Sequence, residues 1–210
     1  MNIRTEPGAW DRKGALPHSQ LASASEMAPV FEIPPAGAYQ LDPDESVITF
    51  ATRHLFGLGA VDGRFRLASG QIHVDGSLPS SWVRLTVKAA SFATGNASRD
   101  TAVRSARLMA AARYPDITFV STALEADDGA WLLRGQLCVR GHEGPADACL
   151  RASRWDGSLL RVRATATVDR YAFGITGARG LAARRLDLWF EIAARPAMAP
   201  GGPARPGGTP

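Results

Sequence analysis

The sequence lacks any long apolar run, which limits how the chain can meet a membrane. None of its hydrophobic stretches approaches the roughly 20 residues that a membrane-spanning helix requires, so a transmembrane helix is excluded. Residues 1–37 also lack the continuous apolar segment of a secretory signal peptide. We therefore expect a cytoplasmic protein without stable membrane insertion.

Cysteines and catalytic signatures are scarce as well. The two cysteines, Cys138 and Cys149, can form neither a disulfide framework nor a four-ligand zinc site, and we expect free thiols in a reducing compartment. His73 and His142 have no Cys, His or Asp partner at ligand spacing, so no metal site is expected. There is no nucleophile elbow, zinc-protease motif or glycine-rich phosphate loop. We expect a binding protein rather than an enzyme, with no cofactor.

Lysine is nearly absent from a basic chain. The 24 Lys and Arg residues give a net charge of +4, yet the lysines are Lys13 and Lys88 alone. The arginines alternate with apolar residues instead of forming a basic run interleaved with aromatic residues. Since single-stranded nucleic acids are bound by such interleaved basic surfaces, we expect no nucleic-acid partner.

The remaining composition is that of a globular protein, with 45% hydrophobic and 21% charged residues. Residues 1–37 show no helical or strand periodicity, and residues 196–210 are rich in proline and glycine. We expect a flexible tail at each end and one folded domain over residues 38–195.

Within this domain, apolar residues repeat with a period of two, which is typical of strands with one buried face. Asp-Gly pairs separate several of these runs, as hairpin connections require. The pattern predicts strands over residues 46–52, 61–67, 70–74, 83–88, 117–124, 133–140, 146–153, 160–169 and 186–192.

One segment has helical character instead. Residues 98–112 follow Ser98 as a candidate N-cap, place Asp100 in the first turn and end before Tyr114-Pro115. The sequence therefore predicts an all-β fold of about eight antiparallel strands with one inserted α-helix.

Such strands form either a closed barrel or a sandwich. We favour the barrel because a helix between consecutive strands can cover an open end, and because several inward positions are small. An interior lined by small residues leaves space for an apolar ligand. The small inward residues are Gly135, Ala146, Ala148, Ala152, Ala164 and Ala166.

Several segments resemble the YceI-like family, and the resemblance spans residues 38–194. The matching segments, in the family's order, are YQLDP (39–43), SVITF (46–50), VDGRF (61–65), SFATGNASRD (91–100), YPDITF (114–119), LCVRG (137–141) and DRYAFGI (169–175). The chain differs from the family pattern at Ala102-Val103, Leu108-Met109 and Gly144. The resemblance implies a lipocalin-like barrel that binds polyisoprenoids or similar long-chain lipids.

We therefore predict a protein that holds a polyisoprenoid, a quinone or a fatty-acid derivative inside its barrel, for sequestration or transport and without covalent chemistry. The inward rows and the helix provide candidate lining residues, each of which could equally be part of a dry core. These are Phe50, Leu55, Phe56, Val103, Leu108, Met109, Phe119, Leu137, Leu150, Val162, Phe173 and Phe190.

Polar residues near the predicted helix and strand ends are candidates for contact with a lipid head group. Arg99, with Asp100 at the helix start, could hold a phosphate or carboxylate, or could be a purely structural pair. Arg170 has the same two interpretations, and His54 could contact a head group or a backbone carbonyl in a turn.

Two other classes of function stay open. An enzyme could use His54 with Arg99 or Asp100 at the barrel mouth. Alternatively, the outer face and the tails could form a protein-interaction module around a dry core. A homodimer is also possible, with the outward-facing Trp189 as a candidate contact.

Overall fold

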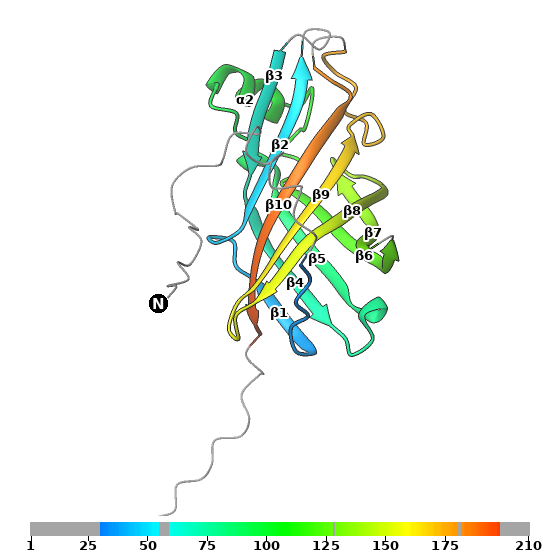
Figure 1. The fold of residues 1–210 in the computed structure, drawn as a ribbon. Coiled ribbons are helices and arrows are strands. Elements are labelled where there is room, and N and C mark those ends of the chain that lie inside the picture. Colours follow the sequence, from blue (N-terminus) through cyan, green and yellow to red (C-terminus); the bar gives the residue numbers. More distant parts are fainter. Residues whose placement is uncertain (1–29, 55–58, 128, 180–181, 198–210) are drawn as a thin grey trace, which may run out of the picture.

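The computed structural model describes residues 30–54, 59–127, 129–179 and 182–197 (Figure 1). In these residues the chain forms ten strands, one α-helix and two short 3-10 helices. In chain order they are β1 (Gly37–Leu41), β2 (Val47–His54), β3 (Gly59–Phe65), β4 (Leu67–Val74), η2 (Leu78–Ser80), β5 (Trp82–Lys88), η3 (Ala89–Ser91), α2 (Ala97–Arg104), β6 (Asp116–Asp127), β7 (Ala130–Val139), β8 (His142–Trp155), β9 (Leu160–Asp169) and β10 (Arg185–Pro196).

Eight of these strands close into an antiparallel barrel. The pairing order runs β1-β4-β5-β6-β7-β8-β9-β10, and β10 pairs back onto β1 through Leu41 and Ala194. The prediction of a barrel of about eight strands with one helix is confirmed. The β2–β3 hairpin adds to the wall because β2 pairs with the other part of β10.

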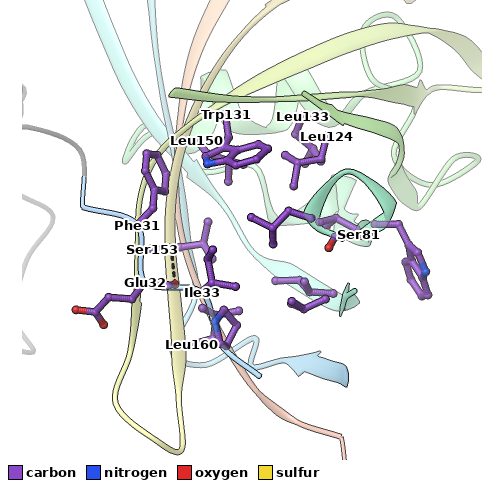
Figure 2. A pocket seen from close by; sticks show the side chains of 17 residues that line it. Phe31, Glu32, Ile33, Ser81, Leu124, Trp131, Leu133, Leu150, Ser153 and Leu160 are labelled. Atoms are coloured by element: carbon purple, nitrogen blue, oxygen red, sulfur yellow. Dashed lines mark hydrogen bonds between the residues drawn. The ribbon is translucent and has the colours of Figure 1, made fainter. Parts of the chain in front are cut away.

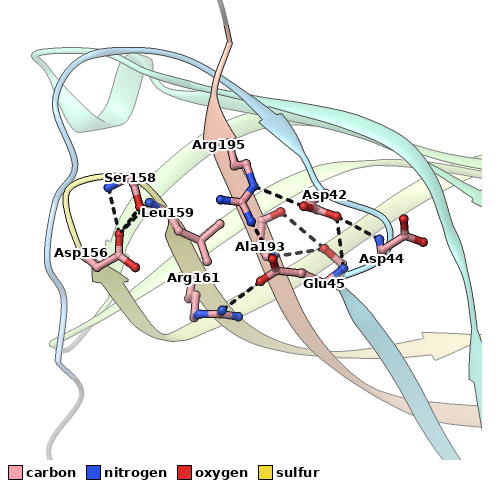
Figure 3. A network of polar contacts seen from close by, with 10 residues as sticks. Asp42, Asp44, Glu45, Asp156, Ser158, Leu159, Arg161, Ala193 and Arg195 are labelled. Atoms are coloured by element: carbon pink, nitrogen blue, oxygen red, sulfur yellow. Dashed lines mark hydrogen bonds and ion pairs between the residues drawn. The ribbon is translucent and has the colours of Figure 1, made fainter. Parts of the chain in front are cut away.

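The turn between β1 and β2 determines how both strands share one edge of β10 (Figure 3). A side-chain oxygen of Asp42 accepts the backbone N–H groups of Asp44 and Glu45, which tightens the turn. Ser46 is buried and bonds both backbone groups of Ala193 through its hydroxyl. Ser46 thus gives both backbone groups of Ala193 a hydrogen-bond partner, which offsets the cost of burying them under the turn.

Two apolar clusters fill most of the interior. The larger one includes Tyr39, Leu41, Ile48, Leu67 and Ile192. The second lies at the end where α2 joins β5 to β6, and we call it the α2-end cluster. Its members are Phe50, Ala89, Phe92, Met109 and Ala111, with the rings of Phe50 and Phe92 stacked at 5.1 Å between centroids.

The space that Gly135 leaves is filled, which contradicts the expectation that this small residue opens the interior. A β-carbon built on Gly135 would overlap the ring of Phe119. Phe119 lies on the neighbouring strand β6 and is buried at 8% exposure. Because Gly135 of β7 has no side chain, the ring of Phe119 from β6 can occupy the interior at this position.

The helix is shorter than predicted. It spans Ala97–Arg104 instead of residues 98–112, and its N-cap is Asn96, which accepts the N–H of Arg99 at 3.0 Å, so the assignment of Ser98 as N-cap is wrong. Ser105 is extended, and its hydroxyl donates to the carbonyl of Ala102 at 2.7 Å. The carbonyls of Val103 and Arg104 accept the N–H groups of Met109 and Ala111, so the last carbonyls are satisfied without another helical turn, although the residues that follow favour helices.

The described chain extends beyond the predicted limits of the domain. Residues 30–36 precede β1, and Phe31 forms an isolated parallel bridge with Ser153 of β8. At the other end, Pro196 still belongs to β10. The rest of the predicted tails, residues 1–29 and 198–210, lies outside the described residues. Among the described helices, none combines the length and the apolar character needed to cross a membrane.

Candidate functional site

An apolar cavity of about 120 Å³ lies at the end of the barrel opposite α2 (Figure 2). The topology requires this placement, because η2 connects β4 to β5 whereas α2 connects the far end of β5 to β6. The cavity is lined by Phe31, Glu32, Ile33, Pro34, Ile72, Val74, Leu78, Ser81, Trp82, Val83, Leu124, Trp131, Leu133, Leu150, Ser153, Leu160 and Val162.

The cavity wall offers little polar chemistry. Glu32, Ser81 and Ser153 are its polar members, and each is bonded within the protein. The hydroxyl of Ser81 accepts the N–H of Asp75 at 2.9 Å, and that of Ser153 donates to the Glu32 carbonyl at 2.8 Å. The Glu32 carboxylate accepts the N–H of Trp155 at 2.9 Å. Since these groups have partners, the wall favours an apolar occupant.

Strand register brings the lining side chains together. Trp131 of β7 lies opposite Leu150 of β8, and Leu133 lies opposite Leu124 of β6. Strict alternation would place Leu150 and Ser153 on opposite faces of β8, since they are an odd number of residues apart. An irregularity in the β8–β9 register between Leu150 and Ala152 shifts the alternation, so that both residues reach the cavity.

Leu150 and Val162 are the predicted lining residues that the structure brings into this cavity. Several others lie in packed regions elsewhere. Phe50 and Met109 belong to the α2-end cluster, against which Val103 also packs. Phe119 fills the space beside Gly135, and Phe173 is buried with its ring in van der Waals reach of Gly144.

The remaining apolar candidates have other surroundings. Phe190 packs against the larger interior cluster, and Leu137 lies opposite Gly144. Leu108 fills the space beside Gly177, in the loop between β9 and β10. Leu55 and Phe56 lie outside the described residues.

The polar candidates near α2 hold the adjoining loop. Arg99 donates to the hydroxyl of Thr94 at 2.8 Å, and Asp100 accepts the N–H of Thr94 at 3.0 Å. Burial alone would raise the pKa of Asp100, but the hydrogen bonds from Thr94 and the nearby charges of Arg104 and Arg99 outweigh it, and the pKa lies below 3.8. Asp100 is therefore a charged anchor for the turn before the helix.

Arg170 is buried and fully occupied by the loop that follows it. Its guanidinium donates to four backbone carbonyls, those of Ala183, Ile175, Gly177 and Ala182, at 2.6–3.0 Å. Burial lowers the pKa of the Arg170 guanidinium below its usual value. These contacts match the structural interpretation of Arg170.

His54 ends β2, where its backbone pairs with Gly59, and its side chain lies outside the described part of the structure. In the described ranges, no three His, Cys, Asp or Glu side chains gather as metal ligands. Cys138 and Cys149 are free thiols.

Sequence reasoning missed most of the cavity wall. Val83 and Leu133 lie on predicted strands, but the alternation carries no signal that distinguishes their end of the barrel from the end nearer the helix. Phe31, Ile33 and Pro34 were assigned to a tail because this segment shows no periodicity.

Comparisons with known proteins agree on one family. A family model described as "YceI-like domain" matches residues 39–194. A UPF0312 protein of Shewanella baltica (strain OS185) is 30% identical over 179 residues, which cover 81% of this chain and 92% of that protein.

Solved structures share the fold at lower sequence identity. Burkholderia cenocepacia BcnA is 20% identical with a TM-score of 0.66, and the match covers 73% of this chain and 98% of that one. A polyisoprenoid binding domain from Saccharophagus degradans, described as implicated in plant cell wall breakdown, is 16% identical with a TM-score of 0.59; this match covers 78% of this chain and 100% of that one.

Proposed function

Because this chain belongs to the YceI-like family, we propose that it binds an apolar lipid, one end of which occupies the cavity at the η2 end of the barrel. The observation that carries the proposal is the chemistry of the cavity wall. Its side chains are almost all aliphatic or aromatic, and its polar members are already paired within the protein. Such a site gains free energy by removing apolar surface from water.

The volume of the cavity limits what it holds at once. A cavity of about 120 Å³ is similar to the engineered 150 Å³ cavity that takes up benzene, so it suits roughly five or six carbons. At about 0.8 kcal/mol per buried CH₂, five carbons contribute about 4 kcal/mol, or roughly a thousandfold in affinity. The rest of a long chain would need further space.

We propose a polyisoprenoid, a quinone or a fatty-acid derivative as the ligand class. The name of the Saccharophagus degradans neighbour, a polyisoprenoid binding domain, supports the first of these. The role we propose is sequestration or transport, with no cofactor and no covalent step. The free thiols Cys138 and Cys149 support a reducing compartment, and we propose the cytoplasm.

Native mass spectrometry of the protein purified from its own host tests the proposal. We expect an added mass that organic extraction releases as a lipid. Replacing Val83→Trp should fill the cavity and remove the added mass, whereas Val120→Trp should retain it, because Val120 lies on β6 and is 41% exposed. Absence of bound lipid, together with no affinity for isoprenoid or acyl probes, would contradict the proposal.

The possible homodimer stays a separate proposal. Trp189 lines a hollow of about 440 Å³ on the outer face of β7 to β10, together with Thr165 and Asp187. Sedimentation velocity of the wild type and of Trp189→Ala tests it, with a dimer expected from the wild type alone. A wild-type mass of one chain at high concentration would end this proposal.

A further inference from the structure

The barrel wall has a discontinuity beside the cavity. In the described residues, the last pair between β7 and β8 joins Trp131 to Leu150, yet β8 continues to Trp155. Beyond Leu150, the edge of β8 that faces β7 therefore has no partner among the described residues of β7. Trp131, Leu150 and Ser153 all line the cavity, so this discontinuity adjoins it directly.

The segment before β1 covers the exposed edge. We call residues 30–34 (Val30, Phe31, Glu32, Ile33 and Pro34) the strap. Ser153 donates its N–H to the carbonyl of Val30 at 2.9 Å and accepts the N–H of Glu32 at 3.1 Å. The Ser153 hydroxyl and the N–H of Trp155 add bonds to Glu32 at 2.8 and 2.9 Å. As Figure 2 shows, the strap runs alongside β8 at the cavity.

The strap has little apolar burial along its length, since Pro34 is its one buried residue, and its base is tied separately to β1. A single bridge, Phe31 with Ser153, takes the place of a ladder. Val30 and Ile33 are 42% and 59% exposed, although both are large hydrophobic residues. At the base, the hydroxyl of Tyr39 donates to the Pro35 carbonyl at 2.6 Å. Segments with few buried contacts open at a low free-energy cost, so the strap can detach while β1 stays in the sheet.

We propose that the strap is the gate of the apolar cavity, and that a lipid chain enters between β7 and the end of β8 when the strap detaches. This rests on the proposed function, and it adds how the site is reached. Phe31, Glu32, Ile33 and Pro34 all belong to the cavity wall, so their displacement both opens the site and enlarges it. A chain longer than the closed cavity can hold is then accommodated at the position that the strap vacates.

Stopped-flow binding of a fluorescent polyene fatty acid tests the gate. The variant Glu32→Ala/Ser153→Ala removes two side-chain bonds between the strap and β8. We expect the association rate to rise about tenfold and Kd to fall by a similar factor, with a smaller change in the dissociation rate, because two lost hydrogen bonds favour the detached strap by about that factor and a long bound chain keeps the strap detached. The control variant Glu125→Ala/Ser158→Ala also removes one carboxylate and one hydroxyl at this end of the barrel, but neither group bonds to the strap. It should keep the wild-type binding rates.

A second measurement does not depend on lipid. Val83→Cys, in a background with Cys138→Ser and Cys149→Ser, places one thiol in the cavity wall. Its reaction with N-ethylmaleimide should accelerate when Glu32 and Ser153 are both replaced by alanine. If the two alanine substitutions change neither the labelling rate of the thiol nor the binding rates of the fatty acid, the proposal that the strap is a gate is wrong. If labelling accelerates but no apolar probe binds even to the wild type, the gate stands and the proposed lipid binding fails.

Discussion

Gly63 and Gly135 each face a phenylalanine ring from a neighbouring strand. A β-carbon at either position would overlap that ring, which belongs to Phe50 at Gly63 and to Phe119 at Gly135. Both rings are buried. The two glycines therefore accommodate large interior side chains, and the chain gains apolar burial where strand propensity alone would disfavour glycine.

Replacing Gly135→Ala should destabilise the protein by about 1–3 kcal/mol, because the added methyl group meets both the Phe119 ring and the carbonyl of Val120. Chemical denaturation measures the free energy of unfolding. Gly76→Ala is the control, since nothing lies within 4 Å of its added β-carbon. Equal stabilities of the two variants would show that Phe119 does not occupy this space.

Asp100 makes stability depend on pH. Its pKa in the folded protein lies below the ordinary 3.8, so the stabilisation that it gives is present above about pH 4 and is lost as the pH falls through the folded pKa. Asp100→Asn should lower the melting temperature by several degrees at pH 7 and reduce the difference from wild type at pH 3. A difference that grows on acidification would contradict this assignment.

At the scale of elements, the strands were predictable and the helix was predictable only in part. Alternation identified the runs that became β5 to β10, since a wall with one buried face imposes a period of two. The helix-favouring composition after Ser105 was misleading. Backbone bonds from Met109 to Val103 and from Ala111 to Arg104 fold this segment back on the helix end, which places Met109 in the α2-end cluster. Such tertiary contacts leave no local signal.

The N-cap tests this correction. Asn96→Ala should cost about 1 kcal/mol of stability, because the side chain of Asn96 accepts the N–H of Arg99. Ser98→Ala should have little effect, since Ser98 is an exposed residue inside the helix. Thermal unfolding of both variants distinguishes the assignments. A larger loss from Ser98→Ala would restore Ser98 as the cap.

At the scale of the whole molecule, the barrel was predictable and the position of its cavity was not. Leu150 and Val162 line the cavity and were among the predicted residues because alternation marks inward residues along the whole length of a strand. The alternation of apolar and polar residues does not indicate at which end of the barrel the interior side chains leave a cavity. That depends on a register irregularity in β8, on Phe119 beside Gly135 and on the strap, which the sequence presents as part of a tail.

The most direct measurement of the central claim is a methyl NMR titration of the protein with a short apolar alcohol. If the cavity at the η2 end is the lipid site, the methyl signals of Leu133, Leu150 and Val162 should shift, while those of Val103 and Leu108 near α2 stay in place. Shifts confined to Val103 and Leu108, or no shifts at saturating alcohol, would contradict the account.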